Sequence, residues 1–181
     1  MKIINLPQIS DLKLLQPTFF QDDRGYFFES YNHETFKKLG IEDVFVQDNQ
    51  SFSKKNVIRG LHFQVPPFAQ AKLVRVIKGA VLDVAVDLRK KSHTYGQHFS
   101  IELNEENQLQ LYIPAGFAHG FAVLEDNTLL AYKCSNSYHK DSERSIIFND
   151  KDLNINWNIE NPLVTDKDLQ GICFKDFISP F

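Results

Sequence analysis

Hydrophobic and polar residues alternate over two adjoining segments near the middle of the chain, residues 72–77 and 80–88. Alternation with a period of two is typical of strands with one buried face, and Lys78-Gly79 predicts a turn between a pair of strands. Further apolar segments, separated by turn residues, cover residues 26–31, 44–53, 98–103, 108–113, 117–124 and 128–134. Short strands at this spacing predict an all-β fold, either a sandwich or a barrel.

Helical patterning is confined to one short segment, residues 33–39, which Asn32 is placed to cap and Gly40 to end. The tail from residue 149 has no regular pattern. A chain of 181 residues can bury one sizeable core, and no linker or internal repeat divides it. We therefore expect a single domain, residues 1–181, with a few short helices at its periphery.

Charge and composition exclude some classes of function. A net charge of −3 and a pI near 6.1 do not suit a protein that binds duplex nucleic acid. The N-terminal apolar segment is too short for a signal peptide, and no apolar run reaches the length of a membrane-spanning helix. Cys134 and Cys173 lie far apart without metal-ligand spacing, so we expect free thiols. These features predict a cytoplasmic protein without nucleic-acid or membrane partners.

The central segments carry more ionisable side chains than a structural strand pair needs, namely Arg59, His62, Lys72, Arg75, Asp83 and Asp87. We interpret this stretch as one wall of a catalytic cavity. His62 would act as a base and Lys72 as a fixed cation able to stabilise an enolate. The alternative for Lys72 is a side chain that extends to the surface along its aliphatic stem.

Two polar features flank this region. Residues 47–51 are polar within an apolar context, which fits a strand facing a wet cavity or an exit into a loop. Arg24 and Glu29 flank the predicted strand 26–31, where a solvated ion pair is the alternative to a binding role.

His62 and His119 occupy similar settings beside glycine-containing turns. Pro114-x-Gly116-x-x-His119 resembles the second half of the cupin signature, and Gly60-x-His62-x-Gln64 resembles an altered first half. Gln64 stands where a metal-binding cupin has a second histidine, and the glutamate that should follow is missing. Two histidines without a carboxylate suit a catalytic divalent metal poorly, so we expect no metal. Two structural histidines are the alternative.

Several longer motifs agree on one family: residues 47–51 (QDNQS), 59–64 (RGLHFQ), 70–74 (QAKLV), 83–89 (DVAVDLR) and 114–121 (PAGFAHGF), with Tyr132-Lys133, Tyr138 and Glu143. From about residue 24 to 168 the chain resembles the dTDP-4-dehydrorhamnose 3,5-epimerases. The resemblance implies a cupin-like jelly-roll barrel, no cofactor, and a homodimer in which the N-terminal strand contacts the partner. It also implies a role in making dTDP-L-rhamnose for lipopolysaccharide or another cell-surface polysaccharide.

The same resemblance implies roles for individual residues. His62 would be the base, Tyr132 the acid, Asp168 the carboxylate that orients His62, and Lys72 the group that stabilises the enolate; Asp83 is the rival orienting carboxylate. Tyr138 would stack on thymine. The other positions implied to contact the nucleotide or its diphosphate are Arg24, Glu29, Gln47, Asp48, Asn49, Arg59, His119, Glu143 and Lys167.

Three other functions fit parts of this pattern. A sister enzyme could invert only carbon 3 or carbon 5 of a related nucleotide-linked 4-keto-6-deoxy sugar, with the same base and acid. A 3,4-ketoisomerase of related fold would not need Tyr132 and Lys167-Asp168 together. A sugar-nucleotide-binding cupin without activity would not need His62, Lys72 and Tyr132 together. The sequence leaves open the number of inverted centres and the preferred base and sugar.

Overall fold

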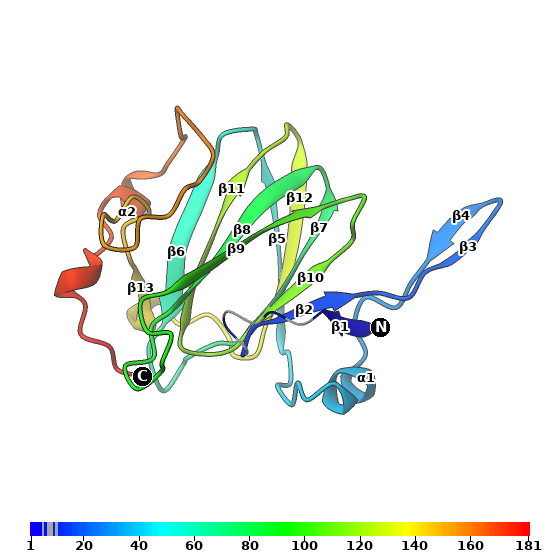
Figure 1. Ribbon diagram of the computed structural model, residues 1–181, viewed down its shortest axis with the longest axis horizontal. Coiled ribbons are helices and arrows are strands. Elements are labelled where there is room, and N and C mark those ends of the chain that lie inside the picture. Colours follow the sequence, from blue (N-terminus) through cyan, green and yellow to red (C-terminus); the bar gives the residue numbers. More distant parts are fainter. Residues whose placement is uncertain (5, 7–8, 10) are drawn as a thin grey trace.

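Two antiparallel sheets, packed face to face, form the body of the computed structural model, which describes residues 1–4, 6, 9 and 11–181 (Figure 1). One sheet has six strands, in the order β1 (Lys2–Ile4), β2 (Lys13–Gln16), β10 (Gln110–Ile113), β7 (Lys72–Lys78), β12 (Thr128–Cys134) and β5 (Gln47–Ser53). The other has five, in the order β13 (Glu143–Ser145), β6 (Ile58–Gln64), β11 (Phe117–Val123), β8 (Ala80–Asp87) and β9 (His98–Asn104). The predicted all-β sandwich is confirmed.

The two central strands form as predicted, but they do not pair with each other. β7 pairs with β10 and β12 in the six-stranded sheet, whereas β8 pairs with β11 and β9 in the five-stranded sheet. Gly79 joins them with a φ of +78°, and a Cβ atom there would collide with Thr128. The expected strand pair is therefore wrong, because the turn carries the chain from one sheet to the other.

The main core lies between the sheets, where alternate residues of each strand point inward. Val74, Leu111 and Leu130 of the six-stranded sheet pack with Ala85 and Phe121 of the five-stranded sheet. All five side chains are buried. This core fills the space between the two sheets at these positions.

A short helix covers part of the outer face of the six-stranded sheet. Helix α1 (His33–Lys38) begins at Asn32, whose side chain accepts hydrogen bonds from the N–H groups of Glu34 and Thr35, as predicted. Its Phe36 packs in a second core with Leu15, Leu73 and Tyr112. No helix in the described part of the chain is long and apolar enough to cross a membrane.

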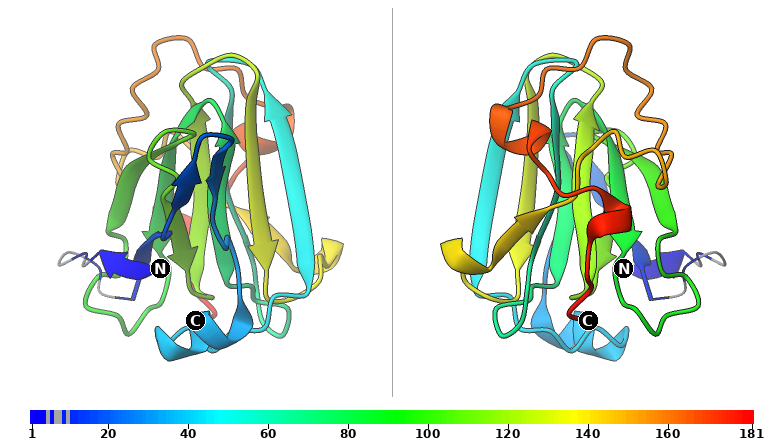
Figure 2. Two further views of the ribbon diagram at one scale, coloured as in Figure 1. Left: turned by 90° about the vertical axis from the view of Figure 1, so that its right-hand side faces the viewer. Right: turned by 90° about the vertical axis from the view of Figure 1, so that its left-hand side faces the viewer.

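The C-terminal segment covers the outer face of the five-stranded sheet (Figure 2). It contains α2 (Asp166–Leu169) and the short 3₁₀ helix η2 (Phe174–Asp176), and a further 3₁₀ helix, η1 (Lys140–Ser142), precedes β13. Trp157 is buried here and donates a hydrogen bond to the carbonyl of Phe148 at 2.7 Å. Covering this face lets β6, β8 and β11 carry apolar residues on both sides.

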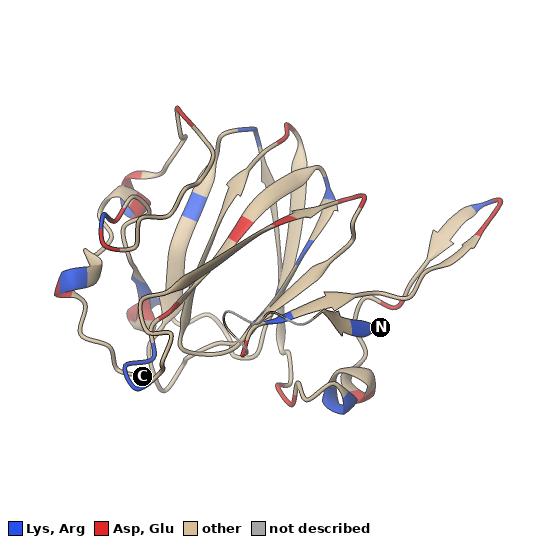
Figure 3. Cartoon of the chain, viewed as in Figure 1, with Lys and Arg blue, Asp and Glu red and all other residues tan. Residues whose placement is uncertain are grey.

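A hairpin projects away from the sandwich, formed by β3 (Phe20–Asp22) and β4 (Gly25–Phe27) (Figure 1). Its tip carries charges of both signs (Figure 3). Its aromatic side chains are exposed, including Phe27 at 69% and Phe20 at 63%. The predicted strand 26–31 is wrong beyond Phe27, because the next residues leave the hairpin and lead into α1.

The backbones of β6 and β11 touch where two glycines meet. A Cβ atom on Gly60 would lie 2.5 Å from the Cα of Gly120, and one on Gly120 would lie 2.8 Å from the carbonyl oxygen of Arg59. The pairing places His62 opposite His119 and shifts its register just beyond His119. Only glycine fits at this contact, which sets the two histidines side by side.

Asp87, expected in the catalytic wall, lies instead in a structural ion-pair network outside the cavity. Its carboxylate is fully buried and accepts hydrogen bonds from Arg89, Ser92 and Thr94. Burial alone would raise the pKa of Asp87, but these hydrogen bonds outweigh it and lower the pKa to about 2. Arg75 is also outside the cavity: it is three residues from Lys72, and an odd spacing along a strand reverses the face.

We expect Asp87→Asn to lower the free energy of unfolding at pH 7 by about 2 kcal/mol, because the lowered pKa favours the folded state. A depressed carboxyl pKa stabilises above the unfolded value of about 4, and this contribution is lost as the pH falls toward 2. Urea unfolding of both proteins from pH 7 to pH 2 measures it. A constant difference across this range would show that ionisation of Asp87 contributes nothing.

Candidate active site

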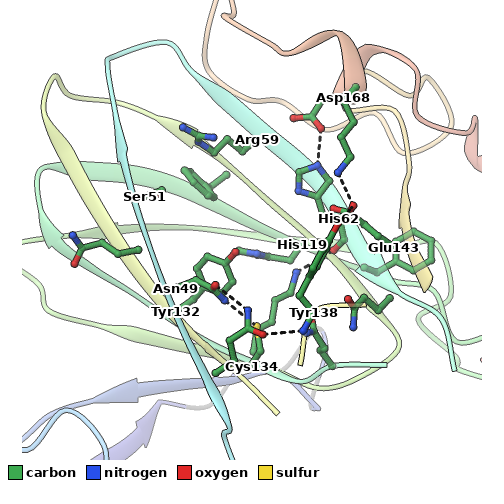
Figure 4. A pocket seen from close by; sticks show the side chains of 18 of the residues that line it. Asn49, Ser51, Arg59, His62, His119, Tyr132, Cys134, Tyr138, Glu143 and Asp168 are labelled. Carbon is green, nitrogen blue, oxygen red and sulfur yellow. Dashed lines mark hydrogen bonds and ion pairs between the residues drawn. The ribbon is translucent and has the colours of Figure 1, made fainter. Parts of the chain in front are cut away.

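A cavity of about 560 Å³ opens between the two sheets (Figure 4). Its walls come from β5, β7 and β12 on one side and from β6, β11 and β13 on the other, with α2 and Tyr138 beside them. The four residues predicted to be catalytic all line it: His62, Lys72, Tyr132 and Asp168. Seven of the ten predicted binding residues line it as well: Gln47, Asn49, Arg59, His119, Tyr138, Glu143 and Lys167.

His62 and Asp168 form a hydrogen-bonded pair although 106 residues separate them. Nε2 of His62 lies 2.6 Å from Oδ1 of Asp168, and the backbone N–H of Gly60 donates to Oδ2 at 3.4 Å. Burial of Asp168 opposes its ionisation, but the hydrogen bonds from His62 and from the backbone of Gly60 help to outweigh burial and keep the pKa of Asp168 below its usual value. A carboxylate on Nε2 makes that nitrogen the donor, which leaves Nδ1 with a lone pair.

Asp83 contacts the other histidine. Nε2 of His119 lies 2.9 Å from Oδ2 of Asp83, and both side chains are buried. Burial lowers the pKa of His119, and the nearby Lys72 and His62 lower it further, against the attraction of Asp83. His119 is therefore neutral at pH 7. The geometry puts Asp168, and not Asp83, against His62.

Lys72 lies on the inner face of β7, as one of the two interpretations predicts. Its side chain is buried, and Nζ donates a hydrogen bond to the carbonyl of His62 at 3.1 Å. Burial lowers the pKa of Lys72, while Cys134, Asp83 and Glu143 oppose this shift. The amine can donate a hydrogen bond in either protonation state, so it suits an oxyanion.

Tyr132 belongs to β12 of the six-stranded sheet, whereas His62 belongs to β6 of the five-stranded sheet. Both line the same cavity (Figure 4). Burial raises the pKa of Tyr132, so its hydroxyl stays protonated at neutral pH and can donate a proton. A histidine able to accept a proton and a phenol able to donate one thus line the same cavity from opposite sheets.

The polar run 47–51 forms strand β5, so the prediction of a strand facing a cavity is confirmed. Gln47 and Asn49 point inward, and Nε2 of Gln47 donates to Oδ1 of Asn49 at 2.9 Å. Asp48 points outward because neighbouring strand residues face opposite sides. It pairs with Lys133 at 2.7 Å and is absent from the cavity wall.

A charged group borders the cavity beside His62 (Figure 4). Nζ of Lys167 lies 2.6 Å from Oε2 of Glu143, and the hydroxyl of Tyr138 donates to the same oxygen at 3.0 Å. Arg59 donates through Nε and Nη2 to the hydroxyl of Ser53, each at 3.2 Å. Two cations and one exposed aromatic ring at one cavity suit an anion attached to a planar group.

Arg24 and Glu29 do not line this cavity. Arg24 lies at the tip of the hairpin, with its side chain 90% exposed, and pairs with Asp22. Glu29 accepts hydrogen bonds from Asn32 and Thr35 beside α1. An ion pair between Arg24 and Glu29, the alternative to a binding role, is absent from the described contacts, and neither residue lines the cavity of its own chain.

Several cavity residues were missed by the sequence analysis, among them Ser51, Phe121 and Cys134. Each lies two positions beyond a predicted site residue on the same strand: Asn49, His119 and Tyr132. The period of two along a strand is the signal that would have found them. The hydroxyl of Ser51 is buried and has no hydrogen-bond partner among the described residues.

Gln64, which stands where a metal-binding cupin has histidine, uses its amide for hydrogen bonds to the backbone. Within residues 1–4, 6, 9 and 11–181, no group of three or more His, Cys, Asp and Glu side chains is placed to hold a metal ion.

Comparisons with known proteins agree with this geometry. The family model of dTDP-4-dehydrorhamnose 3,5-epimerase matches residues 7–176. An enzyme of that name from Shigella flexneri is 49% identical over 93% of this chain and 94% of its own. A crystal structure from Legionella pneumophila, in complex with dTDP-4-keto-L-rhamnose, is 45% identical, with a TM-score of 0.94 over 98% of this chain and 94% of its own.

A more distant structure belongs to a 3'-monoepimerase, ChmJ from Streptomyces bikiniensis, in complex with dTDP-quinovose. It is 31% identical, with a TM-score of 0.88 over 95% of this chain and 88% of its own. Proteins named as a 3,5-epimerase and as a 3'-monoepimerase thus share this fold. The family model spans most of the chain, and relatives near 50% identity match it over almost their whole length. The chain belongs to the dTDP-4-dehydrorhamnose 3,5-epimerase family.

Proposed function

We propose that this protein inverts carbons 3 and 5 of dTDP-4-dehydro-6-deoxy-D-glucose, as a dTDP-4-dehydrorhamnose 3,5-epimerase of dTDP-L-rhamnose synthesis. One observation carries the proposal: the His62–Asp168 pair and Tyr132 enter one cavity from opposite sheets, and Lys72 lies in that cavity on the strand next to that of Tyr132. Inversion next to a ketone needs these groups. A base removes a proton from one face, a donor stabilises the enolate, and an acid protonates the other face.

In this mechanism Nδ1 of His62 removes the proton, because Nε2 is held by Asp168. The carboxylate orients the ring and stabilises the imidazolium that forms. Lys72 donates a hydrogen bond to the oxygen of the enolate, and Tyr132 gives its proton to the opposite face. Only protons move, so the carbon skeleton keeps its oxidation state and no redox cofactor takes part.

The rest of the cavity would hold the nucleotide. Arg59 and Lys167 would neutralise the diphosphate, for which the planar guanidinium of Arg59 is well shaped. The exposed ring of Tyr138 would stack on the base. His119, neutral and with Nε2 held by Asp83, offers Nδ1 as an acceptor, which suits a sugar hydroxyl better than a phosphate oxygen.

Proton exchange tests this function. We would incubate the protein in deuterated water with dTDP-4-dehydro-6-deoxy-D-glucose and follow carbons 3 and 5 by NMR. Deuterium at both carbons, with formation of the inverted product, is the expected result. The monoepimerase relative makes inversion of a single centre the second candidate, and label at one carbon would establish it. No exchange would exclude both and leave a sugar-nucleotide-binding protein.

We also propose a homodimer in which the β3–β4 hairpin of one protomer reaches the cavity of the other. The hairpin projects from the sandwich, exposes Phe20, Tyr26 and Phe27, and carries Arg24 at its tip (Figure 1). Exposed aromatic residues on a projecting element are typical of an interface. In this arrangement Arg24 and Glu29 would contact the nucleotide in the cavity of the partner, which is the role that the family resemblance implies for them.

Complementation between two defective variants tests this arrangement. Arg24→Ala would disable the partner's site, and His62→Ala would disable its own. In a mixed dimer the site with an intact His62 would also receive an intact Arg24. Co-expression in equal amounts should therefore restore about a quarter of wild-type activity, since half of the dimers are mixed and each has one complete site. Activity no greater than the sum of the two variants would place Arg24 outside the partner's site.

We propose a cytoplasmic location on the state of the cysteines. Cys134 is buried and Cys173 is exposed, and both thiols are free. Free thiols are the rule in reducing compartments.

A further inference from the structure

Gln64 ends strand β6 and makes three hydrogen bonds to backbone groups of two loops. Its Nε2 donates to the carbonyl of Phe68 at 2.7 Å and to that of Ser137 at 3.2 Å. Its Oε1 accepts from the N–H of His139 at 2.7 Å. The side chain is 4% exposed, so these bonds satisfy both donors and the acceptor of a buried amide.

The bonds of Gln64 bracket Tyr138, since Ser137 precedes it and His139 follows it. A second glutamine also binds this segment, because Oε1 of Gln47 accepts a hydrogen bond from the N–H of Tyr138 at 2.8 Å. Gln47 belongs to the six-stranded sheet and Gln64 to the five-stranded sheet. The peptide groups on both sides of Tyr138 are therefore anchored to both halves of the sandwich.

The ring of Tyr138, in contrast, has little support of its own. It is 55% exposed, and its described polar contact is the hydrogen bond from its hydroxyl to Glu143. A parallel stack of Phe68 on His139, with ring centres 3.8 Å apart, joins the two loops that Gln64 binds. The position of the ring thus depends on the backbone beneath it.

We propose that Gln64 is a positioning residue that holds Tyr138 as a rigid platform for a planar nucleobase. The inference rests on the proposed function of Tyr138 in stacking. A ring that is already fixed loses little conformational freedom when a base stacks on it, so a preorganised platform strengthens binding. Gln64 lines the cavity but acts on the base through Tyr138.

Gln64→Met keeps the length of the side chain but removes all three hydrogen bonds. We expect it to raise the dissociation constant of dTDP, measured by calorimetry, and the KM of the sugar nucleotide, each about tenfold. Binding of inorganic pyrophosphate, which has no base, should not change, and kcat should stay within about twofold of wild type. In a Tyr138→Ala background, Gln64→Met should weaken dTDP binding no further.

Asn107→Ala is the matched control, because Asn107 also makes three hydrogen bonds to backbone groups, in a turn outside the cavity. It should leave dTDP binding unchanged. If Gln64→Met does not fold, Gln64→Asn keeps a neutral amide but is one carbon too short to reach both loops, and it should weaken dTDP binding in the same way. Equal losses for dTDP and pyrophosphate, or losses that add to those of Tyr138→Ala, would overturn the inference. Failure of the wild-type protein to bind dTDP would instead overturn the proposed function and the inference with it.

Discussion

His62→Ala should abolish deuterium exchange at carbons 3 and 5 and lower kcat by about 10³- to 10⁴-fold. Nε2 of His62 is hydrogen-bonded to Asp168, so Nδ1 carries the lone pair that can remove a proton. Removal of the ring takes away the base and leaves Asp168 without its partner. NMR in deuterated water, run beside product analysis, measures both effects on one sample.

His98→Ala provides a control with the same chemical change, since His98 lies outside the cavity wall. It should exchange at the wild-type rate. Thermal unfolding of both variants separates a lost base from a lost fold. Exchange that persists at one carbon in His62→Ala would show that a second base serves that carbon, and His62 would then have only half of the proposed role.

Tyr132→Phe should separate exchange from inversion. His62 would still remove a proton, and with its side chain 31% exposed it can trade that proton for solvent deuterium. Without the phenol on the other sheet, His62 delivers the deuterium to the face from which it removed the proton. The recovered substrate should therefore carry label with unchanged configuration, while formation of the inverted product falls by about 10²- to 10⁴-fold.

Tyr95→Phe removes a hydroxyl outside the cavity wall, from a ring that packs on Phe174, and should behave as wild type. Inversion at the normal rate in Tyr132→Phe would assign the acid to another group. Loss of exchange together with inversion would mean that Tyr132 is needed before proton abstraction, in binding or in polarising the ketone.

Strand positions could be predicted from the sequence because alternation is local. β12 and β7 have nearly the predicted bounds, and Asn32 caps α1 as expected. Pairing could not be predicted, because it depends on distant partners. β7 and β8 are consecutive yet belong to different sheets, and nothing in the turn at Gly79 says which strand each will meet.

The candidate site was predictable mainly through resemblance to a family. Spacing could not choose between Asp168 and Asp83 as the partner of His62, because the choice depends on how α2 folds back onto β6. Local patterns also misplaced Arg75, Asp83 and Asp87 in the cavity wall. The alternation of faces along β7 is enough to place Arg75 outside the cavity. The side-chain network around Asp87, in contrast, is visible only in three dimensions.

Because His62 and Tyr132 belong to opposite sheets, the packing between the sheets also determines the distance between these two residues. The thickness of the layer formed by Val74, Leu130 and Phe121 sets the gap that the substrate must span between them. Sheets that pack about 10 Å apart shift when interior volume changes. A substitution such as Leu130→Ala, at a residue that does not line the cavity, should therefore lower the rate of proton transfer while the protein is still folded. In this architecture the hydrophobic core sets the distance between the proposed base and the proposed acid.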